Sequence, residues 1–218
     1  MRLWPLVTGL LLASAGWAEV ELTPRVGYRS GGFDVTTDIV CIQAPIQPPC
    51  PTFAESEDDL LYGLVLDVPV RRNLQLELLV DHQPTSLVFR DFLGVGPASY
   101  PRADLDITHV HAGVLRSWRP SSVEPFVVLG AGRSWLRSDP VVPGVRVDWQ
   151  RPSASLGAGA KIGLGSSDRL ALRLEARGYW VDLPRADYRG PLLPLEGVRR
   201  LSSDLRQLEA TTGLSIKF

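Results

Sequence analysis

The sequence predicts an all-β protein, an eight-stranded antiparallel transmembrane β-barrel in up-and-down meander order. Three observations predict it: apolar and polar residues alternate along most of the chain, short and long connections alternate, and the polar face combines glycines with charges of both signs. Successive side chains of a strand point to opposite faces, so this alternation gives each strand one apolar and one polar face. If the same residues formed an α-helix, the two sets would be mixed on every side of it.

The overall composition narrows the function classes. The 218 residues carry 23 Lys plus Arg against 24 Asp plus Glu, a net charge of −1. This balance lacks the excess of positive charge that nucleic-acid binders use, so we expect no nucleic-acid partner. After the first 20 residues, no apolar run is long enough for a membrane-spanning helix.

Residues 1–18, MRLWPLVTGLLLASAGWA, have the organisation of a secretory signal peptide. Arg2 precedes an apolar run, and Gly16 and Ala18 supply small residues at positions −3 and −1 of a cleavage site. The apolar run is too short to span a bilayer. We therefore expect cleavage after Ala18 and a barrel domain over residues 19–218.

Export makes a disulfide the expected state of the two cysteines, Cys41 and Cys50. They lie close together in a Pro-rich stretch without a strand pattern, and an oxidising compartment favours closure of such a surface loop. A metal site is disfavoured because the nearest histidine is His82 and the chain has no second cysteine pair. We expect no metal and no cofactor.

The alternating segments follow one another at regular spacing. The clearest is 153–164, SASLGAGAKIGL, in which every second residue from Ala154 to Leu164 is apolar. The other predicted strands are 20–29, 62–70, 74–83, 105–118, 124–136, 169–181 and 207–218. The phase is least regular in 105–118 and 124–136. On the apolar face of these two segments we place Val110, Ala112, Val114, Trp118, Val127, Leu129 and Ala131.

Tight turns and long connections alternate between these strands. The tight turns are predicted at 71–73, 120–122 and 165–168, and the long loops at 36–58, 90–104, 137–147 and 184–204. Short turns at one end and long loops at the other are typical of membrane barrels. The first loop is acidic and the last is basic, through Glu55, Glu57, Asp58 and Asp59 in the first and Arg185, Arg189, Arg199 and Arg200 in the last. We expect these four loops to be extracellular and to offer a surface for an extracellular ligand.

Alternation alone does not tell which face points outward. The polar face carries glycines such as Gly63, Gly157 and Gly213, which a narrow barrel needs inside, where its strands curve. The same face carries as many cations as anions, which can pair in a closed lumen as a filling network, since buried pairs barely repay their desolvation. The predicted lumen charges are Glu21, Arg25, Arg29, Asp67, Glu77, Asp81, Lys161, Arg173, Glu175, Arg177, Glu209 and Lys217.

Aromatic residues support the same orientation of the two faces. Tyr28, Tyr62, Trp118, Trp180 and Phe218 fall near strand ends on the apolar face. Aromatic rings prefer the bilayer interface. The apolar face is therefore predicted to point toward lipid.

Two sequence motifs point to a family. The C-terminus, TTGLSIKF, alternates Leu214, Ile216 and Phe218, and it resembles the terminal strand signal that barrel-assembly machinery reads on bacterial outer-membrane proteins. The segment LDITHVHAGVLRSWRPSSVEPFVVLGAGRSW resembles the central hairpin of the small porin-like outer-membrane barrel family, and RLALRLEARGYW resembles its seventh strand. The resemblance implies a Gram-negative outer-membrane protein. The chain departs from the peptidoglycan-binding members of the class, and we expect no periplasmic domain after the barrel. The resemblance also implies contact with outer-membrane lipids and lipopolysaccharide, and with the assembly machinery during insertion.

An eight-stranded barrel is filled by its own side chains, which favours a structural or surface-binding role without a catalytic residue. Two alternatives stay open: a narrow diffusion channel, and a lipid A-modifying hydrolase like those on other small outer-membrane barrels. His109 and His111 lie on one strand face, and we expect both in the lumen hydrogen-bond network. Ser117 lies too far along the strand to serve His111 as a nucleophile. His82 is expected at the membrane interface.

Overall fold

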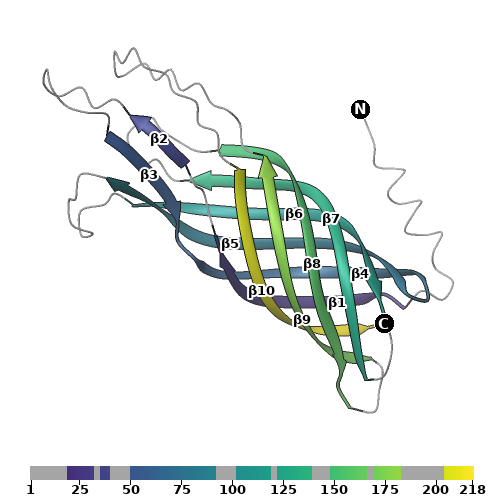
Figure 1. Ribbon diagram of the computed structural model, residues 1–218. Helices are drawn as coiled ribbons and strands as arrows, with labels where there is room; N and C mark the ends of the chain where they lie inside the picture. Colours follow the sequence, from purple (N-terminus) through teal and green to yellow (C-terminus); the bar gives the residue numbers. More distant parts are fainter. Residues whose placement is uncertain are drawn as a thin grey trace, which may run out of the picture.

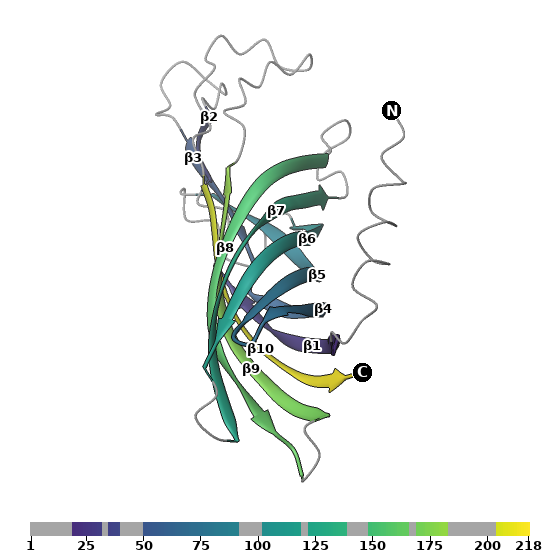
Figure 2. The same cartoon turned by 90° about the vertical axis from the view of Figure 1, so that its right-hand side faces the viewer.

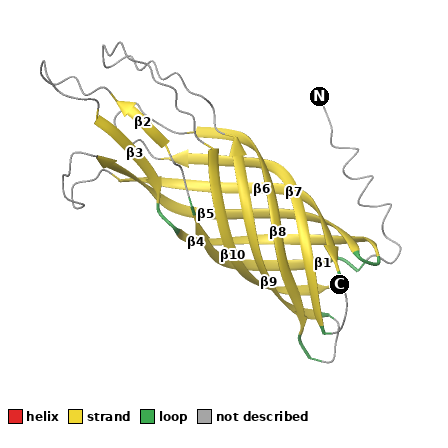
Figure 3. Cartoon of the chain, viewed as in Figure 1, coloured by secondary structure: helices red, strands yellow, loops and turns green. Residues whose placement is uncertain are grey.

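The computed structural model describes residues 19–31, 35–39, 50–91, 102–118, 122–138, 148–165, 169–182 and 204–218. All regular secondary structure in these ranges is β-strand (Figure 3). The strands are β1 (Glu21–Ser30), β2 (Val35–Ile39), β3 (Cys50–Ser56), β4 (Asp59–Arg71), β5 (Leu74–Asp91), β6 (Arg102–Ser117), β7 (Val123–Ser138), β8 (Asp148–Gly163), β9 (Leu170–Asp182) and β10 (Asp204–Lys217). Within these ranges no helix is long and apolar enough to cross a membrane.

Eight of the strands close into an antiparallel barrel (Figures 1 and 2). The neighbour order is β1, β4, β5, β6, β7, β8, β9 and β10, and β10 pairs back onto β1. The predicted eight-stranded meander is therefore confirmed. Its strands agree with the predicted segments, but several are longer, above all β5 and β8.

The strands are strongly tilted, as the register shows. A row of paired residues that starts at Glu21 passes through Asp67 on β4 and Glu77 on β5, and reaches Gln207 on β10. Because Leu208 pairs with Ser30, the row meets β1 again about ten residues further along. Such an offset corresponds to the steep tilt of a small barrel.

The short turns and both barrel termini gather at one end, which we call the turn end. Arg71 and Leu74 pair across the first turn, and the backbone N–H of Phe218 donates to the carbonyl of Val20 at 3.0 Å. The connections 92–101, 139–147 and 183–203 leave from the opposite end, which we call the loop end. The predicted tight turn at 71–73 is confirmed.

The prediction of a loop without strands over 36–58 is wrong. β2 and β3 pair with each other, and β3 pairs with β5 from Ser56↔Leu87 to Thr52↔Asp91. β5 runs well beyond the first residue of β4, so its backbone groups on the β4 side lack a barrel partner there. β3 supplies that partner, because backbone N–H and C=O groups need hydrogen bonds. Residues 1–18 and Cys41 lie outside the described residues, so the signal peptide and the disulfide stay predictions.

Apolar side chains point outward along the barrel. Val110, Val114, Val127 and Leu129 are all exposed, which confirms the predicted phase of the two least regular strands. The aromatic side chains placed on the outer face are exposed as well: Tyr28, Tyr62, Trp118, Trp180 and Phe218. An outer surface of this kind suits contact with hydrocarbon.

The inner face is less uniformly polar than predicted. Leu115, Phe126 and Val128 form one buried apolar cluster, and Val65 and Leu79 form another with a tyrosine. Phe126 also lies under the guanidinium of Arg173, 4.7 Å from its ring centroid. Rings and aliphatic side chains thus fill the spaces between the charged groups.

Candidate functional site

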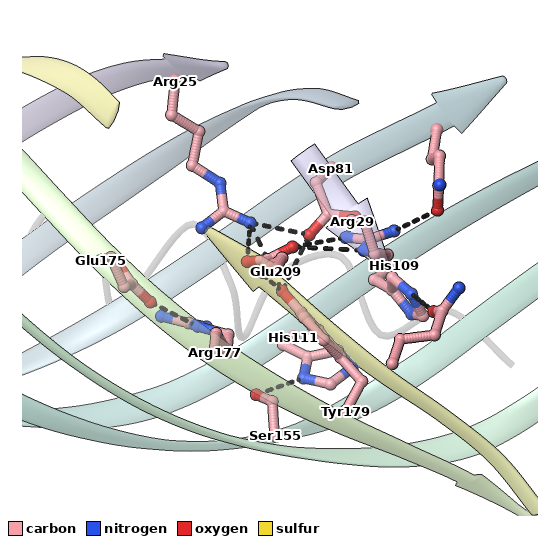
Figure 4. A network of polar contacts seen from close by, with 12 residues as sticks. Arg25, Arg29, Asp81, His109, His111, Ser155, Glu175, Arg177, Tyr179 and Glu209 are labelled. Atoms are coloured by element: carbon pink, nitrogen blue, oxygen red, sulfur yellow. Dashed lines mark hydrogen bonds and ion pairs between the residues drawn. The ribbon is translucent and has the colours of Figure 1, made fainter. Parts of the chain in front are cut away.

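The candidate site is the interior of the barrel, where ionised side chains from opposite walls meet (Figure 4). The strands bring them together because inward positions recur every second residue and the tilt sets which rows face each other. Two groups of charges form. We call them the loop-side cluster and the turn-side cluster, after the end of the barrel to which each is nearer.

The loop-side cluster consists of Arg25, Arg29, Asp81 and Glu209. The Nη2 of Arg25 lies 2.9 Å from Asp81 Oδ2 and 2.7 Å from Glu209 Oε1. The Nη2 of Arg29 lies 2.6 Å from Asp81 Oδ1 and 2.7 Å from Glu209 Oε2. Two guanidinium groups from β1 therefore share two carboxylates from β5 and β10, and the cluster is neutral.

The turn-side cluster is larger and centres on two arginines of β9. Arg173 donates to Asp67 at 2.8 Å, to Glu77 at 2.6 Å and to Glu175 at 2.9 Å. Arg177 donates to Glu77 at 2.7 Å and to Glu175 at 2.5 Å. Each arginine thus uses several donors of its planar fork on different carboxylates.

Lys161 of β8 extends this cluster across the barrel. Its Nζ lies 2.9 Å from Asp67 Oδ2 on β4 and 2.8 Å from Glu21 Oε1 on β1. It also donates to Gln75 Oε1 at 3.2 Å. The turn-side cluster therefore connects β1, β4, β5, β8 and β9 through the lumen.

Tyr179 joins the loop-side cluster to the histidines. Its hydroxyl lies 3.0 Å from the carboxylates of both Asp81 and Glu209. Its ring stacks on His109 with centroids 4.4 Å apart, and the Arg29 guanidinium lies 5.0 Å from its centroid. One aromatic side chain thus occupies the centre of the loop-side half of the lumen.

Both lumen histidines are held by serine hydroxyls. His109 Nδ1 lies 2.5 Å from Ser134 Oγ, and its Nε2 lies 3.1 Å from Gln207 Oε1. Because an amide oxygen only accepts, Nε2 carries the proton and Nδ1 accepts from the serine. His111 contacts two serine hydroxyls at 2.8 and 2.9 Å. A histidine that accepts from a serine resembles a base with its nucleophile, but Ser134 and His109 are fully buried in the filled lumen, out of reach of a substrate.

The structure places the sequence-predicted lumen residues as follows. All predicted lumen charges except Lys217 are buried and take part in the two clusters, and both histidines are buried beside them. Lys217 is half-buried at the turn end, and no ion pair of its ammonium group is found among the described residues. The assembly-signal residues Leu214, Ile216 and Phe218 lie on the outer side of β10, and Phe218 is 74% exposed.

Sequence reasoning did not assign the central role of Tyr179 or the contribution of Ser134. Tyr179 falls on the polar face of a segment with regular alternation, so the sequence predicts its inward position. Its contacts with Asp81, Glu209 and His109 depend on how the strands face one another in the closed barrel. Ser134 lies in the noisier 124–136 segment, where valines and leucines occupy both faces. No group of His, Cys, Asp and Glu suited to a metal ion is found in the described ranges.

A smaller polar group lies on the outer surface, near the loop end. His82 of β5 contacts Thr108 of β6, with Nδ1 and Oγ1 2.9 Å apart. Its Nε2 lies 3.5 Å from Asp106 Oδ1, and its ring lies 5.4 Å from the ring of Tyr62 on β4. His82 points away from the lumen and is half-buried, which is compatible with the interfacial position expected from the sequence.

Comparison with known proteins shows the fold but no family. No family model and no curated protein matches the chain. Among solved structures, Neisserial surface protein A (NspA) is 9% identical, with a TM-score of 0.56, and the match covers 91% of this chain and 97% of that one. The outer membrane protein OprG from Pseudomonas aeruginosa is 12% identical, with a TM-score of 0.56 and coverages of 93% and 98%.

A third solved structure has the same architecture. The outer membrane protein AlkL, solved in DMPC lipid bilayers, is 14% identical, with a TM-score of 0.50 and coverages of 94% and 93%. Identities this low establish architecture and not activity. The chain has the fold of the eight-stranded outer-membrane barrels.

Proposed function

We propose that this chain is an integral barrel of a bacterial outer membrane, with a closed lumen and a structural or surface-binding role in the envelope. The outer-membrane location is supported by the fold and by the many exposed apolar side chains along the barrel strands. The non-enzymatic role is supported by the burial of the described histidines, serines and central carboxylates of the lumen, which a substrate could not reach. Binding of an extracellular partner belongs to the long connections predicted from the sequence.

The observation that carries this proposal is the crossing of the lumen by the two charge clusters. Their ion pairs bridge strands on opposite walls, and Arg29 and Asp67 have no exposed surface. Opening a path would separate several buried pairs at once, and each unpaired charge would cost several kcal/mol. The ground state of the barrel is therefore closed to ions.

Planar-bilayer conductance of the folded protein tests this closure. We expect the wild-type protein to insert without measurable conductance. The double variant Arg29→Ala with Tyr179→Ala removes two large side chains from the loop-side half of the lumen and is expected to pass ions more readily. Steady wild-type currents would contradict the proposal and favour the diffusion channel.

The envelope role is tested by a deletion strain. We expect cells without the protein to become more sensitive to detergent and chelator, and expression of the wild-type chain to restore resistance. An unchanged sensitivity under every growth condition tried would argue against a role in envelope integrity.

One observation favours a lipid-modifying hydrolase as the second candidate function. His82 lies between a hydroxyl, on Thr108, and a carboxylate, on Asp106, and these three side chains face lipid. A base between a hydroxyl and an orienting carboxylate is the arrangement that activates a nucleophile. Mass spectrometry of lipid A from cells with and without the protein tests it. An acyl pattern that changes with the wild-type protein, but not with Thr108→Val, would establish the hydrolase.

A further inference from the structure

We propose that the outer surface of β5, β6 and β7 binds one molecule of lipid A near the loop end. In this site Arg133 holds a phosphate, His82 and Thr108 contact the polar head, and one acyl chain lies in the adjacent apolar groove. The inference rests on the proposed outer-membrane location, which places the loop end in the outer leaflet. It goes beyond that proposal by naming a ligand and the residues that hold it.

Arg133 is a cation with apolar neighbours on the outer face of the barrel. It is exposed on β7, and its cross-strand partners are Val110 on β6 and Pro152 on β8. Among the described residues, no carboxylate lies within ion-pairing distance of its guanidinium. An arginine beside hydrocarbon is stabilised when its head reaches the interface and meets an anion there.

The tilt of the strands brings Arg133 level with His82. Tyr62, His82, Thr108 and Trp135 form one cross-strand row, and such a row climbs toward the loop end from β4 to β7. The row climbs about ten residues over the eight strands, and therefore about two to three residues between β5 and β7. A residue of β7 at the same height along the barrel axis as His82 thus lies about two to three residues from Trp135, on the side of the turn end. Arg133 lies two residues before Trp135 on that side, so its height is that of His82.

This height is where head groups are expected. The row contains a tyrosine, a histidine, a threonine and a tryptophan, and aromatic and polar side chains collect at the membrane interface. Below it, toward the turn end, the outward residues of β7 are apolar from Ala131 to Val123. Arg133 therefore lies at the boundary between the hydrocarbon and the phosphates of the outer leaflet. A guanidinium binds a phosphate through paired donors, which a carboxylate-free neighbourhood leaves available.

An apolar groove continues from this row toward the turn end. It has a volume of about 900 Å³, and its walls include Val26, Tyr62, Leu64, Val80 and Leu214. Gly63 and Gly213 also line it, and His82 lies on its border. A lipid whose phosphate contacts Arg133 and whose head crosses β6 would place an acyl chain here. Lipid A is the outer-leaflet lipid with both a charged phosphate and several acyl chains.

Arg137 provides a matched control on the same face of the same strand. Its cross-strand partners are Asp106 and Asp148, and its Nε lies 3.6 Å from Asp148 Oδ1. Its charge is already offset by neighbours, in contrast to that of Arg133. Both variants lose one positive charge, so the loss of charge by itself is matched between them.

Native mass spectrometry of the full barrel, folded in detergent with added lipid A, tests the site. We expect wild type and Arg137→Gln to retain one lipid A, and Arg133→Gln to retain it at least about tenfold less, the effect of one lost charged hydrogen bond. Leu64→Trp, which fills the groove, is expected to weaken retention as well. Equal loss in Arg133→Gln and Arg137→Gln, or no loss in either, would overturn the proposal.

A second arm separates lipid A from other anionic lipids. Phosphatidylglycerol is offered in the same detergent, and retention of it as strong as that of lipid A would overturn the assignment to lipid A. Heat-modifiable migration in gels reports for each variant whether the barrel has folded. A wild-type chain that fails to fold in detergent would contradict the proposed function itself, whereas a folded barrel that ignores lipid A would contradict only this inference.

Discussion

Arg29 illustrates what a single residue does in this barrel. It has no exposed surface, and its guanidinium meets carboxylates from β5 and β10 while lying against the Tyr179 ring. A buried pair of this kind adds little net stability compared with an apolar filling, because both partners lose their water. Removing one partner alone is costly, since the other charge stays buried without compensation.

The first prediction follows from that asymmetry. We expect Arg29→Met to lower the free energy of unfolding by about 3–5 kcal/mol, because Asp81 and Glu209 then share one guanidinium. Lys217→Met is the control, since Lys217 is half-buried outside both clusters, and it is expected to change stability by less than about 0.5 kcal/mol. Urea titration of the barrel in lipid vesicles measures both. Equal losses of unfolding free energy in the two variants would show that the ion pairs of Arg29 contribute no more to stability than the Lys217 side chain does.

A second prediction at this scale concerns the inward glycine Gly213, with Gly178 as the control, whose Cβ would point outward beside Trp180. A Cβ atom at Gly213 would lie 2.6 Å from the backbone carbonyl oxygen of Pro24, whereas one at Gly178 would lie no closer than 3.5 Å to any neighbour. We therefore expect Gly213→Ala to cost about 1–3 kcal/mol, because a backbone atom must move, and Gly178→Ala to be tolerated. The same urea titration compares them. A Gly213→Ala barrel as stable as wild type would show that the two strands have room to separate.

At the scale of elements, the pattern of alternation predicts the eight barrel strands and the phase of each. In segment 153–164 apolar residues alternate strictly with small or polar ones, so the sequence predicts both this strand and its outer face. The pairing of Arg173 with Glu77 was not readable, because it depends on the shear of the closed barrel. β2 and β3 were not predicted because their sequences show no regular alternation of apolar and polar residues. They form through backbone pairing, β3 with β5 and β2 with β3.

The last strand carries a prediction about assembly. The aromatic ring of Phe218 is exposed at the end of β10, while its backbone N–H donates to Val20, so the side chain contributes little to the folded barrel. We expect Phe218→Ala to reduce the amount of folded barrel in cells and to leave refolding in detergent unchanged. Heat-modifiable migration of membrane fractions and of refolded protein makes the comparison. An equal loss in both would show that Phe218 stabilises the barrel itself.

The connection between β1 and β4 carries a prediction about redox state. We expect Cys41 and Cys50 to be bridged in the exported protein, because an oxidising compartment favours a bond between neighbouring thiols. Iodoacetamide should not label the purified protein before reduction and should add two carbamidomethyl groups after it, as read by mass. Ready labelling without reduction would show that the thiols are free.

At the scale of the whole molecule, the barrel combines an apolar exterior with a charged interior. This arrangement explains why composition alone is uninformative: 44% of the residues are hydrophobic and 22% are charged, values compatible with a water-soluble protein. The distribution over the two faces carries the information. Leu129 is 64% exposed, while Asp67 has no exposed surface.

The last prediction follows from this arrangement of an apolar exterior around a charged interior. Leu129 lies near the middle of the outer face of β7, and Leu60, which is 67% exposed, lies near the loop end of β4. In a membrane barrel, Leu129→Arg should destabilise by about 2–4 kcal/mol, because the guanidinium enters hydrocarbon, and Leu60→Arg by about 0–1 kcal/mol, because it reaches the head groups. In a water-soluble barrel, both exposed leucines would accept arginine without loss. Urea unfolding in lipid vesicles distinguishes the two cases. Equal tolerance at both positions would contradict the membrane orientation on which the proposed closed lumen and the lipid site depend.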